Sequence, residues 1–440
     1  MKSRKSAGLS SRYCRDYLEH LQVHGIKLGL ENIKTLLAAL GDPHESYPSV
    51  HVAGTNGKGS VSAMLASALS VHGLRVGLYT SPHLVRVEER IRIGARLIGG
   101  PDFCRLLGVI RRRIGTLLKD GRLSAHPTYF EVLTAVALLY FRERRVDIAV
   151  LEVGMGGRFD ATNVVTPIAS VITSISRDHE EYLGKGLARI AREKAGVIKP
   201  RVPVVCGCDK GVARAVIERK ARAARAPFRG VFDPPVRFRA VKTAAGYRFL
   251  YDSGREAYRF EPGLRGYHQG WNAAIAIAAA EAIAGTWKPL APGKIVEGIE
   301  RACWPGRLEL VSRRPDVILD GCHNEEGARA LARYIGDFVP GRPILVFAAA
   351  ADKPVRKMAD LLFPSARRVI LTRFPSPRAL DPAQMQRILP AFKANTAIEP
   401  DPMKAVRLAM VEAGRRGTVV VAGSLFLVGE VKRFRSRLKR

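Results

Sequence analysis

The chain has 440 residues, 47 % of them hydrophobic and 25 % charged, a mixture that excludes a disordered chain. No apolar run reaches the roughly 18 residues of a transmembrane helix, and the basic start lacks the apolar core of a secretory signal. We therefore expect a cytoplasmic protein with no membrane partner. The net charge of +32 is dispersed, with one dense run at 432–440, so we expect no specific nucleic-acid partner.

The cysteines form no CxxC pair, and Cys206-Gly207-Cys208 is more typical of a buried strand than of a metal site. Unpaired cysteines fit a reducing compartment. The six cysteines stand at positions 14, 104, 206, 208, 303 and 322.

The length favours at least two domains. Apolar residues recur at helical spacing within 13–40, residues 49–53 predict a strand, and residues 61–69 predict a helix. Between this strand and helix lies Gly54-Thr55-Asn56-Gly57-Lys58-Gly59-Ser60. A strand, a glycine turn with lysine and a helix together are typical of a phosphate-binding loop.

Such a loop predicts that Gly57, Lys58, Gly59 and Ser60 hold a nucleotide, with Ser60 on a magnesium ion. The pattern is imperfect, because Val52 stands where the first glycine belongs and Gly59 separates Lys58 from Ser60. An ordinary turn is the alternative interpretation.

The next segments continue the α/β alternation. Residues 73–80 predict a strand followed by Ser81, and residues 85–93 predict an edge strand or a substrate-facing loop. Residues 101–118 and 130–145 predict helices. Polar residues at the carboxyl ends of parallel strands are where open α/β sheets bind ligands.

Residues 146–152 form a nearly continuous apolar run that predicts a buried parallel strand with Glu152 at its tip. In phosphate-loop enzymes such an acid holds the metal, although a surface glutamate is the alternative. Residues 167–175 predict another strand, after which His179 is either a metal ligand or a structural histidine. A helix over 187–196 places Lys194 beside the same sheet edge, and residues 202–206 predict a further strand.

The second half changes character. Short strand-like pieces within about 230–265 predict a small antiparallel appendage, and residues 271–284 predict a helix. After a hinge at Trp304-Pro305-Gly306-Arg307, a new alternation begins. Its predicted strands are 316–320, 344–347, 368–371 and 418–422.

The fold class is therefore α/β, with a phosphate-loop-containing, mainly parallel sheet domain followed by a smaller Rossmann-like α/β domain. We expect an ATP-binding domain at 1–303, which includes the appendage, a linker at 304–309 and a C-terminal ligase domain at 310–440.

The motifs in order resemble those of the folylpolyglutamate synthase / dihydrofolate synthase family of the Mur ligase superfamily, from about residue 17 to about 432. The first-half motifs are the phosphate loop, Thr80-Ser81-Pro82-His83-Leu84, Thr128-Tyr129-Phe130-Glu131, the segment 152–163 and Glu193-Lys194-Ala195-Gly196. The later motifs are His268-Gln269-Gly270-Trp271-Asn272-Ala273-Ala274, Trp304-Pro305-Gly306-Arg307 and Asp320-Gly321-Cys322-His323-Asn324.

The resemblance implies an ATP-dependent amide ligase of folate biosynthesis and one-carbon metabolism. It adds L-glutamate to dihydropteroate, to a reduced folate or to both, through an acyl phosphate. The cofactors that the resemblance implies are ATP, two Mg²⁺ ions and a CO2-derived carbamate on Lys194. We expect a monomer.

The resemblance also implies roles for individual residues. The catalytic residues are Lys58, His179, Lys194 and His323. The magnesium ligands are Ser60, Ser81, Glu152, His179 and the modified Lys194. ATP is held by Gly57, Lys58, Gly59, Ser60, Asn272, Arg307 and Asp320. The pterin segments contain Thr128, Tyr129, Phe130, Glu131, Phe159, Asp160 and Ala161, and Ser424 joins His323 near the glutamate site.

Two departures concern the second domain. Cys322 and Glu325 replace the family's usual Ala and Pro, and the segment after Phe347 lacks a common Gly. Two alternatives remain open: a peptidoglycan-type Mur ligase with a different acceptor, and a basic nucleic-acid-binding ATPase.

Overall fold

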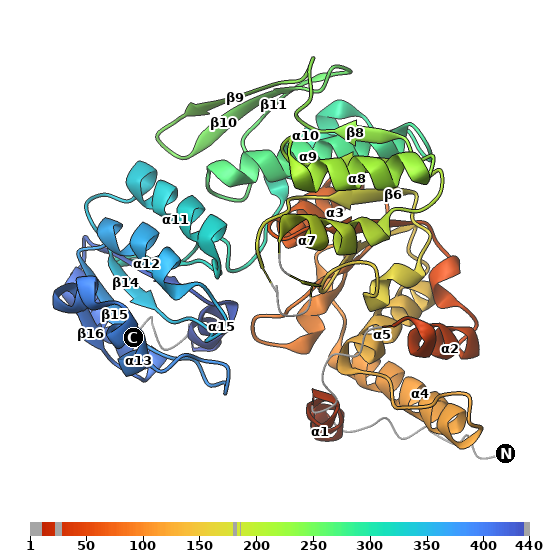
Figure 1. Ribbon diagram of the computed structural model, residues 1–440, viewed down its shortest axis with the longest axis horizontal. Coiled ribbons are helices and arrows are strands. Elements are labelled where there is room, and N and C mark those ends of the chain that lie inside the picture. Colours follow the sequence, from red (N-terminus) through yellow and green to blue (C-terminus); the bar gives the residue numbers. More distant parts are fainter. Residues whose placement is uncertain (1–10, 23–28, 179–182, 185, 435–440) are drawn as a thin grey trace.

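The computed structural model describes residues 11–434 except 23–28, 179–182 and 185. Within these ranges it contains an eight-stranded, a three-stranded and a six-stranded sheet. Figure 1 shows two α/β domains side by side, the second in blue, with the three-stranded sheet along the top. The predicted fold class is confirmed, because both larger sheets are mainly parallel.

The eight-stranded sheet has the order β4-β3-β2-β5-β1-β6-β7-β8. Six neighbouring strands are parallel to one another, namely β2, β5, β1, β6, β7 and β8, whereas β3 and β4 form an antiparallel edge. The strands are β1 (Ser49–Ala53), β2 (Val76–Tyr79), β3 (Ile91–Ile93), β4 (Arg96–Leu97), β5 (Ile148–Glu152), β6 (Ala169–Ile172), β7 (Val204–Cys206) and β8 (Phe228–Gly230).

Helices cover both faces of this sheet, as the fully buried pattern of β5 requires. Ile148 and Val150 point into the core beneath α3, α9 and α10, whereas Ala149 and Leu151 point toward α4 and α5. The helices are α1 (Ser11–Gln22), α2 (Glu31–Ala39), α3 (Lys58–Val71), α4 (Gly100–Lys119), α5 (Tyr129–Glu143), α7 (Leu187–Lys194), α8 (Val212–Ala223), α9 (Tyr267–Ala284) and α10 (Pro292–Arg301).

The three-stranded sheet is the predicted antiparallel appendage. It comprises β9 (Arg237–Lys242), β10 (Tyr247–Asp252) and β11 (Ala257–Phe260), with β10 in the middle. Alternation along β10 buries Tyr247, Phe249 and Tyr251 on one face. These rings join the core that α9 shares with the large sheet, so the appendage is anchored on α9.

The six-stranded sheet of the second domain has the order β12-β13-β17-β14-β15-β16, and only β12 runs antiparallel to its neighbour. Helices α11, α12 and α13 cover one face, and α14 and α15 cover the other. The strands are β12 (Glu309–Ser312), β13 (Asp316–Leu319), β14 (Ile344–Phe347), β15 (Arg368–Leu371), β16 (Thr396–Ile398) and β17 (Thr418–Ala422). The helices are α11 (Glu325–Phe338), α12 (Val355–Leu362), α13 (Pro382–Ile388), α14 (Pro402–Ala413) and α15 (Leu425–Arg433).

Some boundaries differ from the sequence prediction. Helix α3 begins at Lys58, three residues earlier than expected, because the glycine turn leads directly into it. Within 85–93 only Ile91–Ile93 is a strand, and a 3₁₀ turn at Val87–Arg90 precedes it. None of the helices in the described ranges combines the length and hydropathy that a membrane span requires.

Candidate active site

The phosphate loop follows β1 at the carboxyl edge of the large sheet, and two of its glycines are required by its shape. Gly54 has φ +147°, and a Cβ there would lie 1.9 Å from Thr173 Oγ1. Gly57 has φ +84°, and a Cβ there would lie 2.3 Å from Asn272 Oδ1. A side chain at either position would therefore be strained and would clash.

Two lysines converge on this loop. Lys58 Nζ and Lys194 Nζ both donate to the carbonyl oxygen of Gly54, at 3.1 and 2.8 Å. Burial lowers the pKa of Lys194 to about 7, and repulsion from Lys58 acts in the same direction. The prediction that the α7 lysine lies beside the loop is therefore confirmed geometrically.

Glu152 lies at the tip of β5, next to β1, and is buried. Its Oε2 accepts a hydrogen bond from the Ser81 N–H at 3.1 Å. Burial raises the pKa of Glu152 to about 7, although Lys58 and the Ser81 N–H favour the charged carboxylate. The interpretation of Glu152 as a surface residue is therefore wrong.

This carboxyl group fits a hard divalent cation, which prefers oxygen ligands and would favour the charged form. Ser60 is buried in the first turn of α3, and Ser81 lies directly beside Glu152. His179 lies outside the described residues. Among the described residues, no group of three or more His, Cys, Asp or Glu side chains is arranged to hold a metal ion.

Three predicted nucleotide-binding residues lie on the far side of the loop and at the domain boundary. Asn272 from α9 abuts Gly57 and donates to Gln269 Oε1 at 2.9 Å. Asp320 follows β13 and accepts from the Leu308 and Cys322 N–H groups, both at 3.0 Å. Arg307 lies beside Gly321, where a Cβ would be 2.6 Å from its guanidinium nitrogen.

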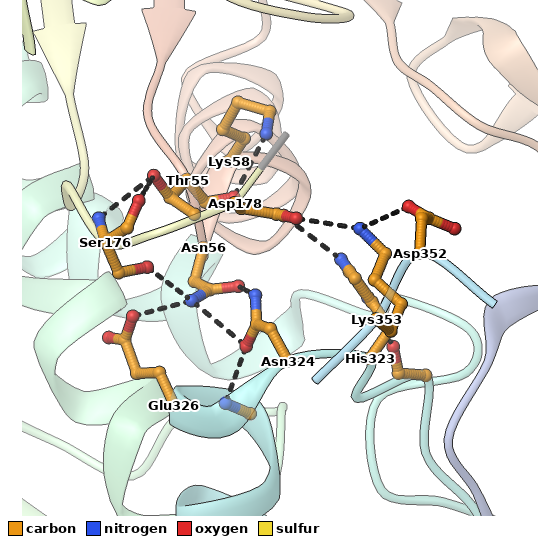
Figure 2. Close-up of polar contacts among 12 residues, drawn as sticks. Thr55, Asn56, Lys58, Ser176, Asp178, His323, Asn324, Glu326, Asp352 and Lys353 are labelled. Carbon is orange, nitrogen blue, oxygen red and sulfur yellow. Dashed lines mark hydrogen bonds and ion pairs between the residues drawn. The ribbon is translucent and has the colours of Figure 1, made fainter. Parts of the chain in front are cut away.

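Polar contacts join the loop to the second domain (Figure 2). Asn56 Nδ2 donates to Glu326 Oε2 at 2.6 Å, and Asn56 Oδ1 accepts from Asn324 Nδ2 at 2.9 Å. Asn324 also caps α11, because its Oδ1 accepts from the Gly327 N–H at 2.9 Å. One asparagine therefore links the start of α11 to the phosphate loop.

A second link between the domains is ionic. Lys353 Nζ lies 2.7 Å from Asp178 Oδ1, and both side chains are about nine-tenths buried. His323 Nε2 lies 3.6 Å from the other oxygen of Asp178 (Figure 2). The structure thus places His323 at the boundary between the domains, on the side that faces the loop.

The predicted pterin segments lie on the other face of the large sheet. Phe130 stacks on Tyr79 with ring centroids 5.9 Å apart, and its ring leaves no room for a Cβ at Gly154. Arg90 lies over the ring of Tyr129 at 5.5 Å. These rings form an apolar wall beside the tips of β2 and β5.

Other members of these segments make local structural contacts. Thr128 and Glu131 form a capping box at the start of α5. Asp160 accepts from the Met155 and Thr162 N–H groups, whereas Phe159 contacts the Arg158 guanidinium at 4.4 Å. Ala161 is buried.

Ser424 caps α15 in the second domain, where its Oγ accepts from the Phe426 N–H at 3.1 Å. This hydrogen bond fixes the serine at the start of α15.

Among the residues that join the domains, sequence reasoning assigned a role to His323 but not to Asn56, Asp178 or Lys353. Asn56 was part of the loop motif, and Asp178 and Lys353 stood next to recognised motifs. Their partners lie more than 170 residues away along the chain, so only the placement of α11 and β14 against the loop reveals them. Asn56 and Asp178 each lie three residues beyond the end of a predicted strand, and this position was the available signal.

Comparison with known protein families supports the arrangement. Residues 52–280 match the Mur ligase middle domain, and residues 306–425 match the Mur ligase glutamate ligase domain. The dihydrofolate synthase/folylpolyglutamate synthase of Bacillus subtilis is 37 % identical over 94 % of this chain and 96 % of its own length.

Solved structures agree over almost the whole chain. The Mycobacterium tuberculosis folylpolyglutamate synthase complexed with ADP has a TM-score of 0.89 at 32 % identity, covering 97 % of this chain and 99 % of its own. Escherichia coli FolC in complex with DHPP and ADP has a TM-score of 0.85 at 29 % identity, covering 97 % and 98 %. The chain therefore belongs to the folylpolyglutamate synthase / dihydrofolate synthase family of Mur ligases, which confirms the resemblance drawn from its motifs.

Proposed function

We propose that this protein is an ATP-dependent ligase that adds L-glutamate to dihydropteroate, to folates or their polyglutamates, or to both. One observation carries the proposal: the phosphate loop, Lys194 and the buried Glu152 share one sheet edge, and that edge faces the second domain. The names of the family members, and the ADP and DHPP bound in the Escherichia coli structure, support this assignment.

The chemistry explains the need for ATP. A carboxylate is a poor acyl donor because its oxygen does not leave readily. In the proposed reaction a carboxylate oxygen of the folate-type acid attacks the γ-phosphorus of ATP, and ADP leaves with the bond electrons. The glutamate amine then attacks the acyl carbon, phosphate leaves, and the amine loses a proton. The products are the amide, ADP and phosphate.

The residues of this chain serve the reaction mainly by binding charge. The N–H groups from Gly57 to Ser60, at the N-terminus of α3, point positive partial charge at the phosphates. Lys58 adds a full positive charge where negative charge develops. Asn272, Arg307 and Asp320 would grip the nucleotide from the far side and from the second domain.

Magnesium ions would be held by Ser60, Ser81, Glu152 and His179, and by Lys194 as a carbamate. Bound Mg²⁺ would screen the triphosphate from the negatively charged acid and polarise the transferring phosphoryl group. The burial of Glu152 and the hydrogen bond that it accepts from the Ser81 N–H support this assignment. A carbamate would place an anionic oxygen where a buried ammonium meets Lys58.

The remaining assignments concern substrates and organisation. We place the pterin at Thr128–Glu131 and Phe159–Ala161, supported by the stacked rings of Tyr79 and Phe130. We place glutamate near His323 and Ser424. The proposed division is an ATP-binding domain at 1–303, a linker at 304–309 and a glutamate ligase domain at 310–440. We propose a cytoplasmic monomer.

The test is a substrate panel with ADP release as the readout. We expect ADP only when a pteroate-type acid, L-glutamate, ATP and Mg²⁺ are all present. Dihydropteroate and a reduced folate assayed separately distinguish the two synthase activities. ADP release driven by a muramyl peptide, or stimulated by DNA or RNA, would refute the proposal.

A further inference from the structure

Helix α11 is held at both ends by the first domain. At its N-terminal end, Asn324 and Glu326 contact Asn56 of the phosphate loop. At its C-terminal end, the helix docks against the appendage and the first turn of α9, an arrangement that Figure 1 shows at the top of the molecule. The appendage has no role in the chemistry proposed above, so this second contact requires an explanation of its own.

The docking contact is made by specific polar groups. Asp337, in the last turn of α11, accepts a hydrogen bond from the Tyr247 hydroxyl of β10. Lys242 Nζ, at the end of β9, lies 3.4 Å from the other carboxylate oxygen. Arg333, one turn earlier in α11, lies 3.6 Å from the same carboxylate. Two strands of the appendage therefore converge on one carboxylate of the second domain.

Aromatic rings complete the contact. The Phe338 ring meets the edge of Tyr247, with centroids 5.1 Å apart and planes at 88°. The Arg333 guanidinium stacks over the Tyr267 ring at 3.5 Å. Tyr247 and Tyr267 also pack against each other, 5.4 Å apart. Rings and charges together form a contact with several independent attachments, which we name the clasp: Lys242, Tyr247, Tyr267, Arg333, Asp337 and Phe338.

The clasp connects directly to the nucleotide-binding region through α9. Tyr267 is the first residue of α9, and Asn272 on the same helix abuts Gly57 of the loop. These two residues are five positions, or about one and a half turns, apart on one helix, so the loop and the first-domain residues of the clasp form one frame against which α11 packs. The second domain thus meets that frame at two points, one at each end of a single helix.

Because α11 is long, its contact at the C-terminal end affects the position of its N-terminal end. A helix of 14 residues is about 21 Å long, so a tilt of roughly 10° about its C-terminal end moves its N-terminal end by about 4 Å. The Asn56–Glu326 distance is 2.6 Å, and a hydrogen bond is lost beyond about 3.5 Å. A tilt of this size about the clasp is therefore enough to break the contact between the start of α11 and the loop.

We propose that the appendage positions the second domain. Tyr247, Arg333 and Asp337 fix the C-terminal end of α11 as a pivot, and the pivot sets Asn324 and Glu326 against Asn56, so that the amine acceptor is presented to the acid activated at the loop. These are positioning residues, which touch neither nucleotide nor acceptor. The inference deepens the proposed function and rests on it for the acceptor's place in the second domain.

The first experiment measures kinetics of Tyr247→Phe, which removes one hydroxyl and keeps the ring, and of Asp337→Ala. We expect KM for L-glutamate to rise about tenfold, the effect of losing one hydrogen bond to a charged group, while the Kd for ATP stays unchanged. The matched control is Arg239→Gln, an exposed residue on the same appendage, which we expect to leave both constants unchanged. Equal loss in the ATP and glutamate constants, or loss of thermal stability alone, would overturn the proposal.

The second experiment requires no substrate, so it separates this inference from the proposed function. Hydrogen exchange measured by mass spectrometry reports backbone opening in residues 54–60 and 324–328. In Tyr247→Phe and Asp337→Ala we expect faster exchange in both segments, although the substitutions lie at the other end of α11. Exchange that increases only around the substituted residue contradicts the pivot. Failure of the wild-type substrate panel, by contrast, contradicts only the proposed reaction.

Discussion

Glu152 and Asp320 occupy equivalent places in the two domains, yet their carboxylates have different surroundings. Glu152 is the last residue of the parallel strand β5, Asp320 directly follows β13, and each side chain is buried. Asp320 accepts two backbone hydrogen bonds, one for each oxygen, and the one from Leu308 ties the end of β13 to the domain linker. Glu152 accepts only one backbone hydrogen bond that the structure records, from Ser81.

The difference shows how one topological position serves two purposes. Each oxygen of Asp320 already accepts a hydrogen bond from a backbone N–H group, which leaves the carboxylate less acceptor capacity for a ligand. Glu152 retains acceptor capacity, and burial raises its pKa to about 7, so it is suited to an incoming cation. Position at a strand end therefore does not show how much acceptor capacity a buried carboxylate keeps for a ligand, whereas its internal hydrogen bonds do.

The strongest challenge to this contrast is Glu152→Gln, which keeps the shape and removes the charge. We expect kcat to fall by about 10³-fold, because the proposed ligand of the activating cation is lost. The measurement is steady-state ADP release at saturating ATP and Mg²⁺. Activity within a few-fold of wild type would place Glu152 with Asp320 as a structural acid.

We also expect the stability of wild type relative to Glu152→Gln to depend on pH. The folded pKa of Glu152 is raised to about 7 from 4.5, so the folded protein binds more protons than the unfolded chain between these values. The metal-free wild type should therefore lose stability relative to Glu152→Gln as pH rises from 4.5 through 7. Denaturant unfolding with EDTA at pH 5 and pH 8 measures the change. A difference that is independent of pH contradicts the raised pKa.

Asp320→Asn tests the other half of the comparison. An amide can accept only through its oxygen, so the Leu308 or the Cys322 N–H loses its partner. We expect a stability loss of about 1–3 kcal/mol and an activity loss of roughly tenfold, smaller than for Glu152→Gln. Denaturant unfolding and ADP release provide the two values. Unchanged stability would show that the paired hydrogen bonds do not organise the linker.

His51 extends the comparison to a buried ionisable group within a strand. It lies in β1, its Nε2 is 2.7 Å from Thr162 Oγ1, and burial lowers its pKa to about 3. The unfolded chain binds this proton below about pH 6.5, so stability falls as pH drops through that value, by about 2 kcal/mol at pH 5. His51→Gln should flatten the acid side of the unfolding curve between pH 7 and 5. An unchanged slope would exclude His51 as its source.

The smallest effect concerns another carboxylate used for backbone shape. Glu131 accepts from the N–H and the hydroxyl of Thr128, at 2.7 and 2.9 Å. Thr128→Ser, the control, keeps this capping box, whereas Thr128→Ala should cost about 1 kcal/mol of stability. If Thr128 serves only as a helix cap, the KM for the pteroate-type acid stays constant in Thr128→Ala. A raised KM would support the predicted contact with the pterin.

The sequence predicted the elements that carry strong local patterns. The strand before the phosphate loop and the apolar run ending at Glu152 have periodicities that leave few alternatives, and both were located correctly. The proximity of Lys194 to the loop followed from the order of strands and helices in a parallel sheet. For these residues the local pattern and the global fold agree.

Contacts between the domains were not predictable in the same way. Asn56 and Glu326 are polar residues with no periodicity, and their pairing depends on how one domain packs against the other. The hydrogen bonds of Asp320 were also hidden, because the partners are backbone N–H groups that carry no sequence signal. The positions of Thr128 and Ser424 directly before helices could have indicated that they are helix caps, but the family motifs led us to assign them to substrate binding.

The position of Trp304 next to the phosphate loop makes its fluorescence a probe of that loop. Its indole nitrogen lies 2.8 Å from where a Cβ on Gly59 would be, and the Arg92 guanidinium lies over its ring at 5.1 Å. The linker residue thus rests directly on the nucleotide loop. Indole emission responds to nearby charge and solvent, whereas Trp271 packs against the rings of Phe232 and Phe238. The protein therefore carries an intrinsic fluorophore at the junction of loop and linker, and nucleotide titrations can be followed optically without a label.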